Sequence, residues 1–260
     1  MTDLIRLDVK PPVAELVLNR PDKRNALSIE MWDAIPQLIG KCVENPDVKV
    51  VLVHGGDAGA FAAGADISEF ETIYATREAA RLSGDTIAAA LNAIEHCPKP
   101  TVSVIDGACV GGGMSLALAC DIRIAARSAK FGITPAKLGL VYPAGDTRRL
   151  LQAVGAGRAK TLLFTGKIVN AETALAYGLV DELFPAEELH AAGEALARDV
   201  AGTSQWSTRA IKQMIAGLQG GWHDDADEAT ELFLQGFENE DHQEGYRAFL
   251  EKRKPDFPIR

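Results

Sequence analysis

Two glycine-rich segments carry the residue types that could do chemistry. The first runs from Phe61 to Ile67 and reads FAAGADI; the second runs from Asp106 to Ser115 and reads DGACVGGGMS. In the second segment a strand-like run ends, three glycines turn the chain, and an apolar helical pattern begins at Met114. The first N–H groups of a helix have no partner inside it, so they can stabilise a negative charge. The sequence therefore predicts a backbone site that favours developing anions.

The first segment is suited to close approach of a ligand. Its alanines and its glycine leave little side-chain bulk, so another backbone or a bound molecule can come near the main chain. Asp66, followed by Ile67, is typical of the start of a helix. Neither segment matches a phosphate-binding fingerprint, because GxxxxGK[ST] is absent and no GxGxxG carries a suitably placed ribose-binding acid.

The elements that position these segments alternate between strand and helix. One helical pattern begins at the N-cap Ser28 and contains Pro36, which is expected to kink it, and another runs from about Arg77 to His96. The β-branched runs that predict strands are Val13–Leu18, Val48–Val53, Thr101–Ile105 and Ile122–Ala125. Strands that alternate with helices indicate the α/β class with a layered core.

The strand signal fades after about Gly155, and the rest of the chain is predicted to be mainly helical. Asn170 has the character of an N-cap, and Gly178 that of the left-handed residue that ends a helix. Further helical patterns cover residues 186–201, 204–218, 226–237 and 242–252. We expect two parts, an α/β core over residues 1–198 and a helical region over residues 199–260.

The composition of the chain excludes or disfavours several classes of protein. The chain has 260 residues, 47% of them hydrophobic, and a net charge of −9, which excludes disorder and disfavours binding to nucleic acid or anionic membranes. Its longest uncharged run, Gly107–Cys120, is too short to span a bilayer, and no signal peptide is evident. The four cysteines lack CxxC spacing and the histidines are scattered, so we expect buried free thiols, no metal site and a cytoplasmic protein.

In this order the segments resemble the crotonase (enoyl-CoA hydratase/isomerase) superfamily, over nearly the whole chain. The matching stretches are Asn19–Pro21, Asn25–Leu27, Phe61–Ile67, Val110–Gly113, Ala119–Ala125, Phe131–Gly132, Leu138–Leu140 and Arg247–Pro255. The resemblance implies a right-handed spiral of ββα turns followed by a helical trimerisation region. It also implies an acyl-CoA substrate whose enolate oxygen accepts hydrogen bonds from the N–H groups of Ala65 and Gly112. No permanently bound cofactor is implied, since coenzyme A arrives as part of the substrate thioester.

The resemblance also implies contacts to coenzyme A. Lys23, Arg24, Ala26 and Ala63 are expected to face the nucleotide and pantetheine, and the basic pair in this set suits phosphates. Phe249 and Lys252 are expected to reach the coenzyme A of a neighbouring subunit. The assembly implied is therefore a homotrimer or a dimer of trimers.

The sequence departs from the hydratase pattern at both catalytic glutamates. Hydratases of this superfamily use two glutamates to add water, and the corresponding residues here are Ser115 and Ala136. Some isomerase and dehalogenase relatives carry an acid in a later loop, where this chain has Pro143. No glutamate occurs between His96 and Ala171, which disfavours ordinary hydration.

Three other groups could act in this region. Asp146 is either an acid/base or a structural residue that caps a helix or pairs with Arg148 or Arg149. Tyr142 is either a packed aromatic residue or the counterpart of a tyrosine in a decarboxylase branch of the superfamily. Glu69 fits better as a solvated residue or one that complements a helix dipole.

Four functions remain open on this basis. The first is isomerisation of an enoyl-CoA with Asp146 as the single base, and the second is decarboxylation of a methylmalonyl-type thioester with Tyr142 as a positioning group. The decarboxylase branch has a histidine where this chain has Ala65, which weakens that match. The third is binding of CoA esters without catalysis, and the fourth is hydration through Ser115 or a bound water. We favour an enzyme, and isomerisation over hydration.

Overall fold

Two β-sheets organise residues 3–259, which are the residues that the computed structural model describes. The six-stranded sheet has the order β1-β2-β3-β5-β7-β10, and the four-stranded sheet has the order β4-β6-β8-β9. The larger sheet contains β1 (Ile5–Lys10), β2 (Val13–Leu18), β3 (Val50–His54), β5 (Thr101–Ile105), β7 (Ile122–Ala126) and β10 (Glu182–Phe184). The smaller contains β4 (Ala60–Ala62), β6 (Ala108–Val110), β8 (Lys130–Gly132) and β9 (Ile168–Asn170).

Successive pairs of strands and a helix repeat as turns of a spiral. In each turn one strand joins the larger sheet, the next joins the smaller sheet, and a helix returns the chain. The three turns are β3-β4 with α3 (Arg77–Glu95), β5-β6 with α4 (Gly112–Ala119), and β7-β8 with α5 (Ala144–Thr165). Strands of neighbouring turns pair in parallel, as return through a helix requires. The α/β class and the ββα spiral are confirmed.

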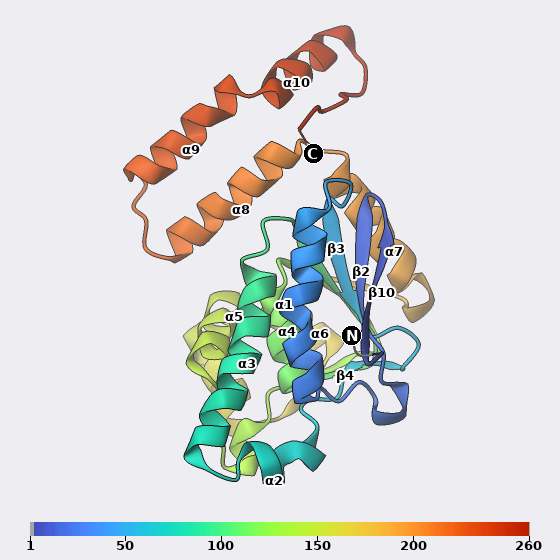
Figure 1. Ribbon diagram of the computed structural model, residues 1–260, viewed down its shortest axis with the longest axis vertical. Helices are drawn as coiled ribbons and strands as arrows, with labels where there is room; N and C mark the ends of the chain where they lie inside the picture. The colour runs from blue at the N-terminus through green and yellow to red at the C-terminus, as the bar shows by residue number, and fades with distance from the viewer. Residues whose placement is uncertain (1–2, 260) are drawn as a thin grey trace.

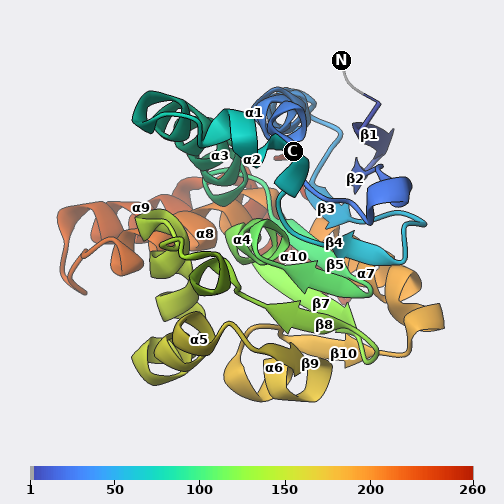
Figure 2. The same ribbon diagram turned by 90° about the horizontal axis from the view of Figure 1, so that it is seen from below.

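The two faces of the larger sheet bury separate cores. Along β3, Val51 and Val53 join the core that contains α1 (Ile29–Glu44), whereas Val50 and Leu52 join the core beneath α7 (Ala186–Ala201). This alternation follows from the period of two in a strand. Helix α4 lies inside the first core, between the α1–α3 group and the α5–α6 group (Figure 2). Helix α4 is thereby buried from Gly113 onward, whereas Gly111 and Gly112 in the turn that begins it stay partly exposed.

Three C-terminal helices extend away from the sheets (Figure 1). They are α8 (Gln205–Gln219), α9 (Asp227–Glu238) and α10 (Glu240–Glu251). Large apolar side chains on them are exposed, namely Ile211, Ile215, Leu218, Phe233, Leu234, Phe237, Tyr246, Phe249 and Leu250. The division expected after residue 198 lies within the last turn of α7, and the two-part organisation stays a prediction.

Most of the predicted elements match, but strand β1 and the full extent of helix α5 were not predicted, and the three-residue strands were missed. Strands β2 and β5 have the predicted bounds, Ser28 caps α1, and α1 continues through Pro36. Asn170 caps α6 (Ala171–Tyr177), which ends at Gly178 with φ of 86°. The expectation that strands cease after about residue 155 was wrong, because β9 and β10 complete the two sheets there. The remaining short helices are η1 (Pro21–Lys23), η2 (Ile67–Glu69), α2 (Phe70–Ile73) and η3 (Pro135–Leu138).

Two further expectations concern the membrane and the cysteines. Among the described residues, no helix combines the length and the apolarity that crossing a bilayer demands. Cys42, Cys97, Cys109 and Cys120 are buried and free, as predicted. Burial raises the pKa of Cys42 to about 11, so this thiol stays protonated and unreactive near neutral pH.

Candidate active site

The two predicted backbone donors lie close together. Leu27 donates its N–H to Gly64 O (2.8 Å) and accepts from Asp66 N (2.9 Å), so the N–H of Ala65 between them points away from Leu27. Gly112 is the first residue of α4, where an N–H has no partner in the helix. A Cβ placed on Gly112 would lie 3.8 Å from Ala65 N. Among the hydrogen bonds of residues 3–259, neither amide is used as a donor.

Asp66 holds the segment that presents Ala65. Its Oδ1 accepts from the backbone N (3.0 Å) and Oγ (2.6 Å) of Ser68, and its Oδ2 pairs with Nη1 of Arg20 at 2.7 Å. The hydrogen bond from the Ser68 side chain, together with Arg20, lowers the pKa of Asp66 to about 2. Asp66 is therefore a charged N-cap of η2, which confirms the predicted helix start.

The glycines of the second segment have distinct roles. Gly111 has φ of 52° and ψ of −114°, a conformation that favours glycine, and its N–H donates to Gly132 O at 2.9 Å. A Cβ on Gly113 would lie 2.6 Å from Ala62 O, so α4 packs directly against β4. The turn therefore brings the start of α4 against the Ala65 segment.

A hydrogen-bonded chain of three side chains lies one turn into α4. Ser115 Oγ donates to Asp146 Oδ2 at 2.8 Å and lies 2.8 Å from the hydroxyl of Tyr142. Ser115 and Asp146 are 2% and 5% exposed, so water barely reaches them. Ser115 follows Gly112 by three residues, which puts its side chain on the same side of the helix as the first backbone donor. The structure thus joins Ser115, Tyr142 and Asp146 beside Gly112.

The hydroxyl protons of this chain can move in either direction. When Asp146 is ionised it only accepts, so Ser115 donates to Asp146 and Tyr142 donates to Ser115. Protonation of Asp146 on Oδ2 reverses its bond with Ser115, whose hydroxyl can then donate to Tyr142 or to Gly111 O at 3.4 Å. Burial raises the pKa of Asp146, against the opposing hydrogen bonds from Ser115 and Arg149. Burial, with the charge of Asp146, also raises the pKa of Tyr142, which therefore stays protonated.

Asp146 has one of the two structural roles foreseen for it. Arg149 Nη1 approaches Asp146 Oδ1 at 3.2 Å, so the predicted ion pair exists. The predicted helix cap does not, because α5 begins after Pro143 without a side-chain cap. Ala136 lies exposed in η3, and Pro143 is also exposed. The carboxyl group that contacts Ser115 thus comes from α5, from the Asp146 that the sequence offered as a candidate.

Four of the six residues expected at coenzyme A form one loop cluster at the surface. Ala63 N donates to Arg24 O at 3.0 Å, and Ala26 N donates to Lys23 O at 3.0 Å. Lys23, Arg24 and Ala63 are exposed. Asn25 is buried beneath them, and its Nδ2 donates to Gly55 O (2.9 Å), Ala60 O (3.0 Å) and Phe61 O (3.2 Å).

Two expected ligand residues lie elsewhere in the chain. Phe249 is 81% exposed on α10, and Lys252 caps the same helix with φ of 54°. In Figure 1 helix α10 lies with α8 and α9 at one end of the molecule, apart from the body of sheets and helices that contains α4. Within the described residues of one chain they do not join Ala65 and Gly112, and their role toward a neighbouring subunit stays a prediction.

Glu69 has a structural role. Its Oε2 accepts from the backbone N of Ile29 at 2.9 Å, so the carboxylate complements the N-terminus of α1. The dipole-complementing interpretation of Glu69 is confirmed, although the helix concerned is α1 and not its own.

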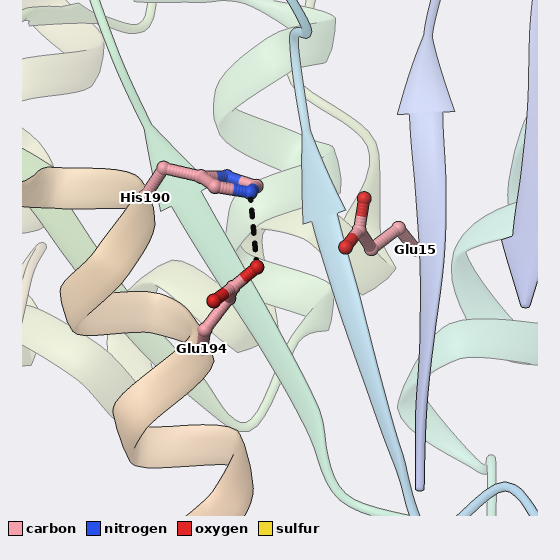
Figure 3. Close-up of side chains that lie close together, drawn as sticks. All are labelled: Glu15, His190 and Glu194. Atoms are coloured by element: carbon pink, nitrogen blue, oxygen red, sulfur yellow. Dashed lines mark ion pairs between the residues drawn. The ribbon is translucent and has the colours of Figure 1, made fainter. Parts of the chain in front are cut away.

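A group that could hold a cation lies between β2 and α7. Ligand atoms of Glu15, His190 and Glu194 are within 4.8 Å of one another (Figure 3). Lys10 Nζ lies 3.4 Å from Glu15, and Arg198 Nη1 lies 3.2 Å from Glu194, so ion pairs already balance both carboxylates. The group is on the face of the large sheet that α7 covers, away from α4. We therefore interpret it as a network of ion pairs.

Comparison with known proteins gives one consistent result. Residues 8–259 match the family model described as enoyl-CoA hydratase/isomerase. A crotonyl-CoA hydratase of Syntrophomonas wolfei is 35% identical over 257 residues, which cover 97% of each chain. A short-chain-enoyl-CoA hydratase of Clostridium acetobutylicum is 33% identical over 254 residues, which cover 95% of each.

A solved structure agrees with these sequences. The crystal structure of an enoyl-CoA hydratase/isomerase family protein from Hyphomonas neptunium is 60% identical, with a TM-score of 0.97, and the match covers 99% of this chain and 98% of that one. The motifs, the ββα spiral and these matches agree. The chain belongs to the enoyl-CoA hydratase/isomerase family, within the crotonase superfamily.

Proposed function

We propose that the protein moves a proton on an acyl-CoA thioester, with Asp146 acting through Ser115 as the single acid/base. The observation that carries the proposal is the 2.8 Å hydrogen bond between Ser115 and Asp146, one helical turn beyond Gly112. In this arrangement Ser115 has the helix position of the first hydratase glutamate, and Asp146 supplies the carboxylate behind it.

The backbone N–H groups of Ala65 and Gly112 are the proposed donors to the thioester oxygen. Removal of a proton next to the carbonyl places negative charge on that oxygen, and fixed peptide dipoles stabilise it without reorganising. The loss of one such donor typically costs about 2.7–4 kcal/mol of transition-state stabilisation. Their proximity and their unused hydrogens support this role.

Isomerisation fits a single carboxyl group. Asp146, through Ser115, takes the C2 proton of a 3-enoyl thioester, a dienolate forms, and the same group returns a proton to C4. The reaction needs no second carboxylate, because the proton is removed and returned by one group. Burial of Asp146 raises its pKa, which suits a group that must both accept and donate.

Hydration is the second candidate, and the relatives support it. Both curated relatives described above are named as hydratases, one for crotonyl-CoA and one for short-chain enoyl-CoA. In this chain a water molecule would have to be oriented by the hydroxyls of Ser115 and Tyr142 and deprotonated toward Asp146. Hydration would therefore proceed without either family glutamate.

The ligand and the assembly follow the same family pattern. Lys23, Arg24, Ala26 and Ala63 are proposed to contact coenzyme A, and their hydrogen-bonded, exposed loops support this. Phe249 and Lys252 are proposed to reach the site of a neighbour in a homotrimer or a dimer of trimers. The exposed apolar side chains of α8–α10 support such an interface. Buried free thiols support a reducing cytoplasm as its compartment.

Three substrates separate the candidate reactions. The protein is incubated with a 2-enoyl-CoA, a 3-enoyl-CoA or a methylmalonyl-type CoA, and the products are followed by chromatography with mass detection. Isomerisation gives a product of unchanged mass and shifted retention, hydration adds one water, and decarboxylation removes CO₂. If all three thioesters bind tightly and return unchanged, the protein is a CoA-ester binding protein and the catalytic proposal is wrong.

A further inference from the structure

Glu95 lies at a position that is electrostatically unfavourable for a carboxylate, and two arginines compensate its charge. It is the last residue of α3, where the C-terminal end of the helix dipole disfavours a negative charge. Arg148 Nη2 lies 2.7 and 2.8 Å from the two Glu95 oxygens, and Arg149 contacts Oε2 through Nε (3.0 Å) and Nη2 (2.6 Å). Burial alone would raise the pKa of Glu95, but these hydrogen bonds outweigh it and lower the pKa.

Arg149 connects this cluster to the candidate active site. Its side chain is 4% exposed, and Nη1 donates to Asp146 Oδ1 at 3.2 Å. Nη2 also donates to Asn92 Oδ1 at 2.8 Å. The planar guanidinium is therefore held from α3 by Asn92 and Glu95 while it meets Asp146 on α5. One oxygen of Asp146 faces Arg149, and the other faces Ser115.

We infer that Glu95 and Arg149 are positioning residues for Asp146: Glu95 holds the Arg149 guanidinium so that it orients Asp146 toward Ser115 without fully neutralising its charge. This inference deepens the proposed function and rests on it. Neither residue needs to touch the substrate, since both act through the carboxyl group of Asp146.

The charges around Asp146 have opposing effects. The Arg149 guanidinium favours the ionised carboxylate, whereas the nearby negative charge of Glu95 disfavours it. Arg148 donates hydrogen bonds to Glu95, and among the described residues none joins it to Asp146. The remaining titratable group near Asp146 is the hydroxyl of Tyr142, which reaches Asp146 through Ser115. An Asp146 paired with Arg149 alone would release its proton at a lower pH.

Glu95→Gln tests the charge while it keeps an acceptor for both arginines. We expect the pKa of Asp146, and with it the acid limb of kcat/KM, to fall by roughly one pH unit. Glu78→Gln is the matched control, because Glu78 lies on the same helix and pairs with Arg81 at 2.8 Å but is well exposed. Arg149→Lys keeps the positive charge but loses the planar guanidinium that contacts Asn92, Glu95 and Asp146 at once. We expect kcat to fall at least tenfold, with a smaller effect on KM.

The pKa of Asp146 is measured independently of turnover, by ¹³C NMR titration of the aspartate carboxyl groups with Asp146→Asn as the assignment reference. A lower Asp146 pKa in Glu95→Gln and an unchanged one in Glu78→Gln are expected. Equal Asp146 pKa values in Glu95→Gln and the parent protein would overturn the inference. A protein that turns over none of the thioesters but shows the pKa shift would instead contradict the proposed function alone.

Discussion

The hydroxyl oxygen of Ser115 lies 2.8 Å from a carboxylate oxygen of Asp146, 31 residues along the chain. Ser115 is on α4 and Asp146 is in the first turn of α5, so two turns of the spiral meet at this hydrogen bond. A side chain as short as serine leaves room that a glutamate would fill. In the proposed mechanism, Asp146 supplies through Ser115 the carboxyl group that the two family glutamates would otherwise provide.

Ser115→Ala breaks the proposed proton path and leaves the backbone donors in place. We expect kcat to fall about 10²–10⁴-fold, the usual contribution of positioned acid–base catalysis. The measurement is steady-state turnover of the best of the three thioesters. Ser103→Ala is the control, since Ser103 is also buried but lies in β5 and makes only a 3.4 Å hydrogen bond to Ile122 O. Equal turnover of both variants would exclude a role for Ser115.

Gly112→Ala places a methyl group beside the proposed donors. Its Cβ would lie 3.8 Å from Ala65 N and 3.2 Å from Trp32 Cζ2, so we expect it to crowd the thioester oxygen and lower kcat about 10²-fold. Gly84→Ala, in α3 with nothing within 4 Å of the new Cβ, is expected to keep full activity and gain about 0.5–1 kcal/mol of stability. Turnover and thermal unfolding of the two variants are compared. Undiminished turnover of Gly112→Ala would contradict the assignment of this donor.

We expect the pH profile of turnover to report the ionisation of Asp146. The proposed base must be ionised to accept a proton, and burial raises its pKa above the ordinary value of 3.8. We expect kcat/KM to rise with pH through this raised pKa and to level off above it. The Asp146→Asn variant, measured over the same range, should show low activity without that rise. A rise of the same midpoint in Asp146→Asn would assign the titration to another group.

Asp66→Asn tests how the Ala65 segment is held. The ordinary pKa of 3.8 is lowered to about 2 in the folded protein, so the charge of Asp66 stabilises the fold above pH 4, and this contribution is lost as the pH falls toward 2. We expect Asp66→Asn to lower the free energy of unfolding by about 1.5 kcal/mol or more at pH 7, since a largely buried charge loses its hydrogen bonds to Ser68 and Arg20. Urea unfolding at pH 7 and pH 3 checks this.

The effect of Asp66→Asn on the free energy of unfolding should depend on pH, and this dependence identifies the charge of Asp66 as the cause. The difference between Asp66→Asn and the parent should shrink from pH 7 to pH 3. Asp22→Asn, at an exposed position in η1, is expected to match the parent at both pH values. A difference that stays constant with pH would show that Asp66 stabilises the loop through its shape and not through its charge.

Elements defined by interactions between residues close in the sequence could be predicted, and elements defined by contacts between distant residues could not. Helices α3 and α7 and strands β2 and β5 were predicted closely, because their hydrophobic periods and caps are local. The three-residue strands β4, β6 and β8 were missed, since they are defined by pairing between successive turns of the spiral. Strands of that length carry too little pattern to be recognised alone.

The same distinction applies to the candidate site. Ala65 and Gly112 were identified from glycine-rich motifs and a family resemblance, and the structure brings them together. The contact of Ser115 with Asp146, and that of Glu95 with Arg149, join residues 31 and 54 positions apart. Asp146 was a candidate from the sequence, but no local pattern encodes such pairs, so its contact with Ser115 appears only in the folded chain.

The most direct test is hydrogen exchange at the carbon next to the thioester carbonyl. The protein is incubated with a 3-enoyl-CoA in D₂O, and deuterium incorporation at C2 and C4 is followed by mass and NMR for the parent and for Asp146→Asn. We predict rapid incorporation with the parent and at least 10²-fold slower incorporation with Asp146→Asn, while the thioester still binds. Equal exchange rates in the two proteins would show that Asp146 is not the acid/base.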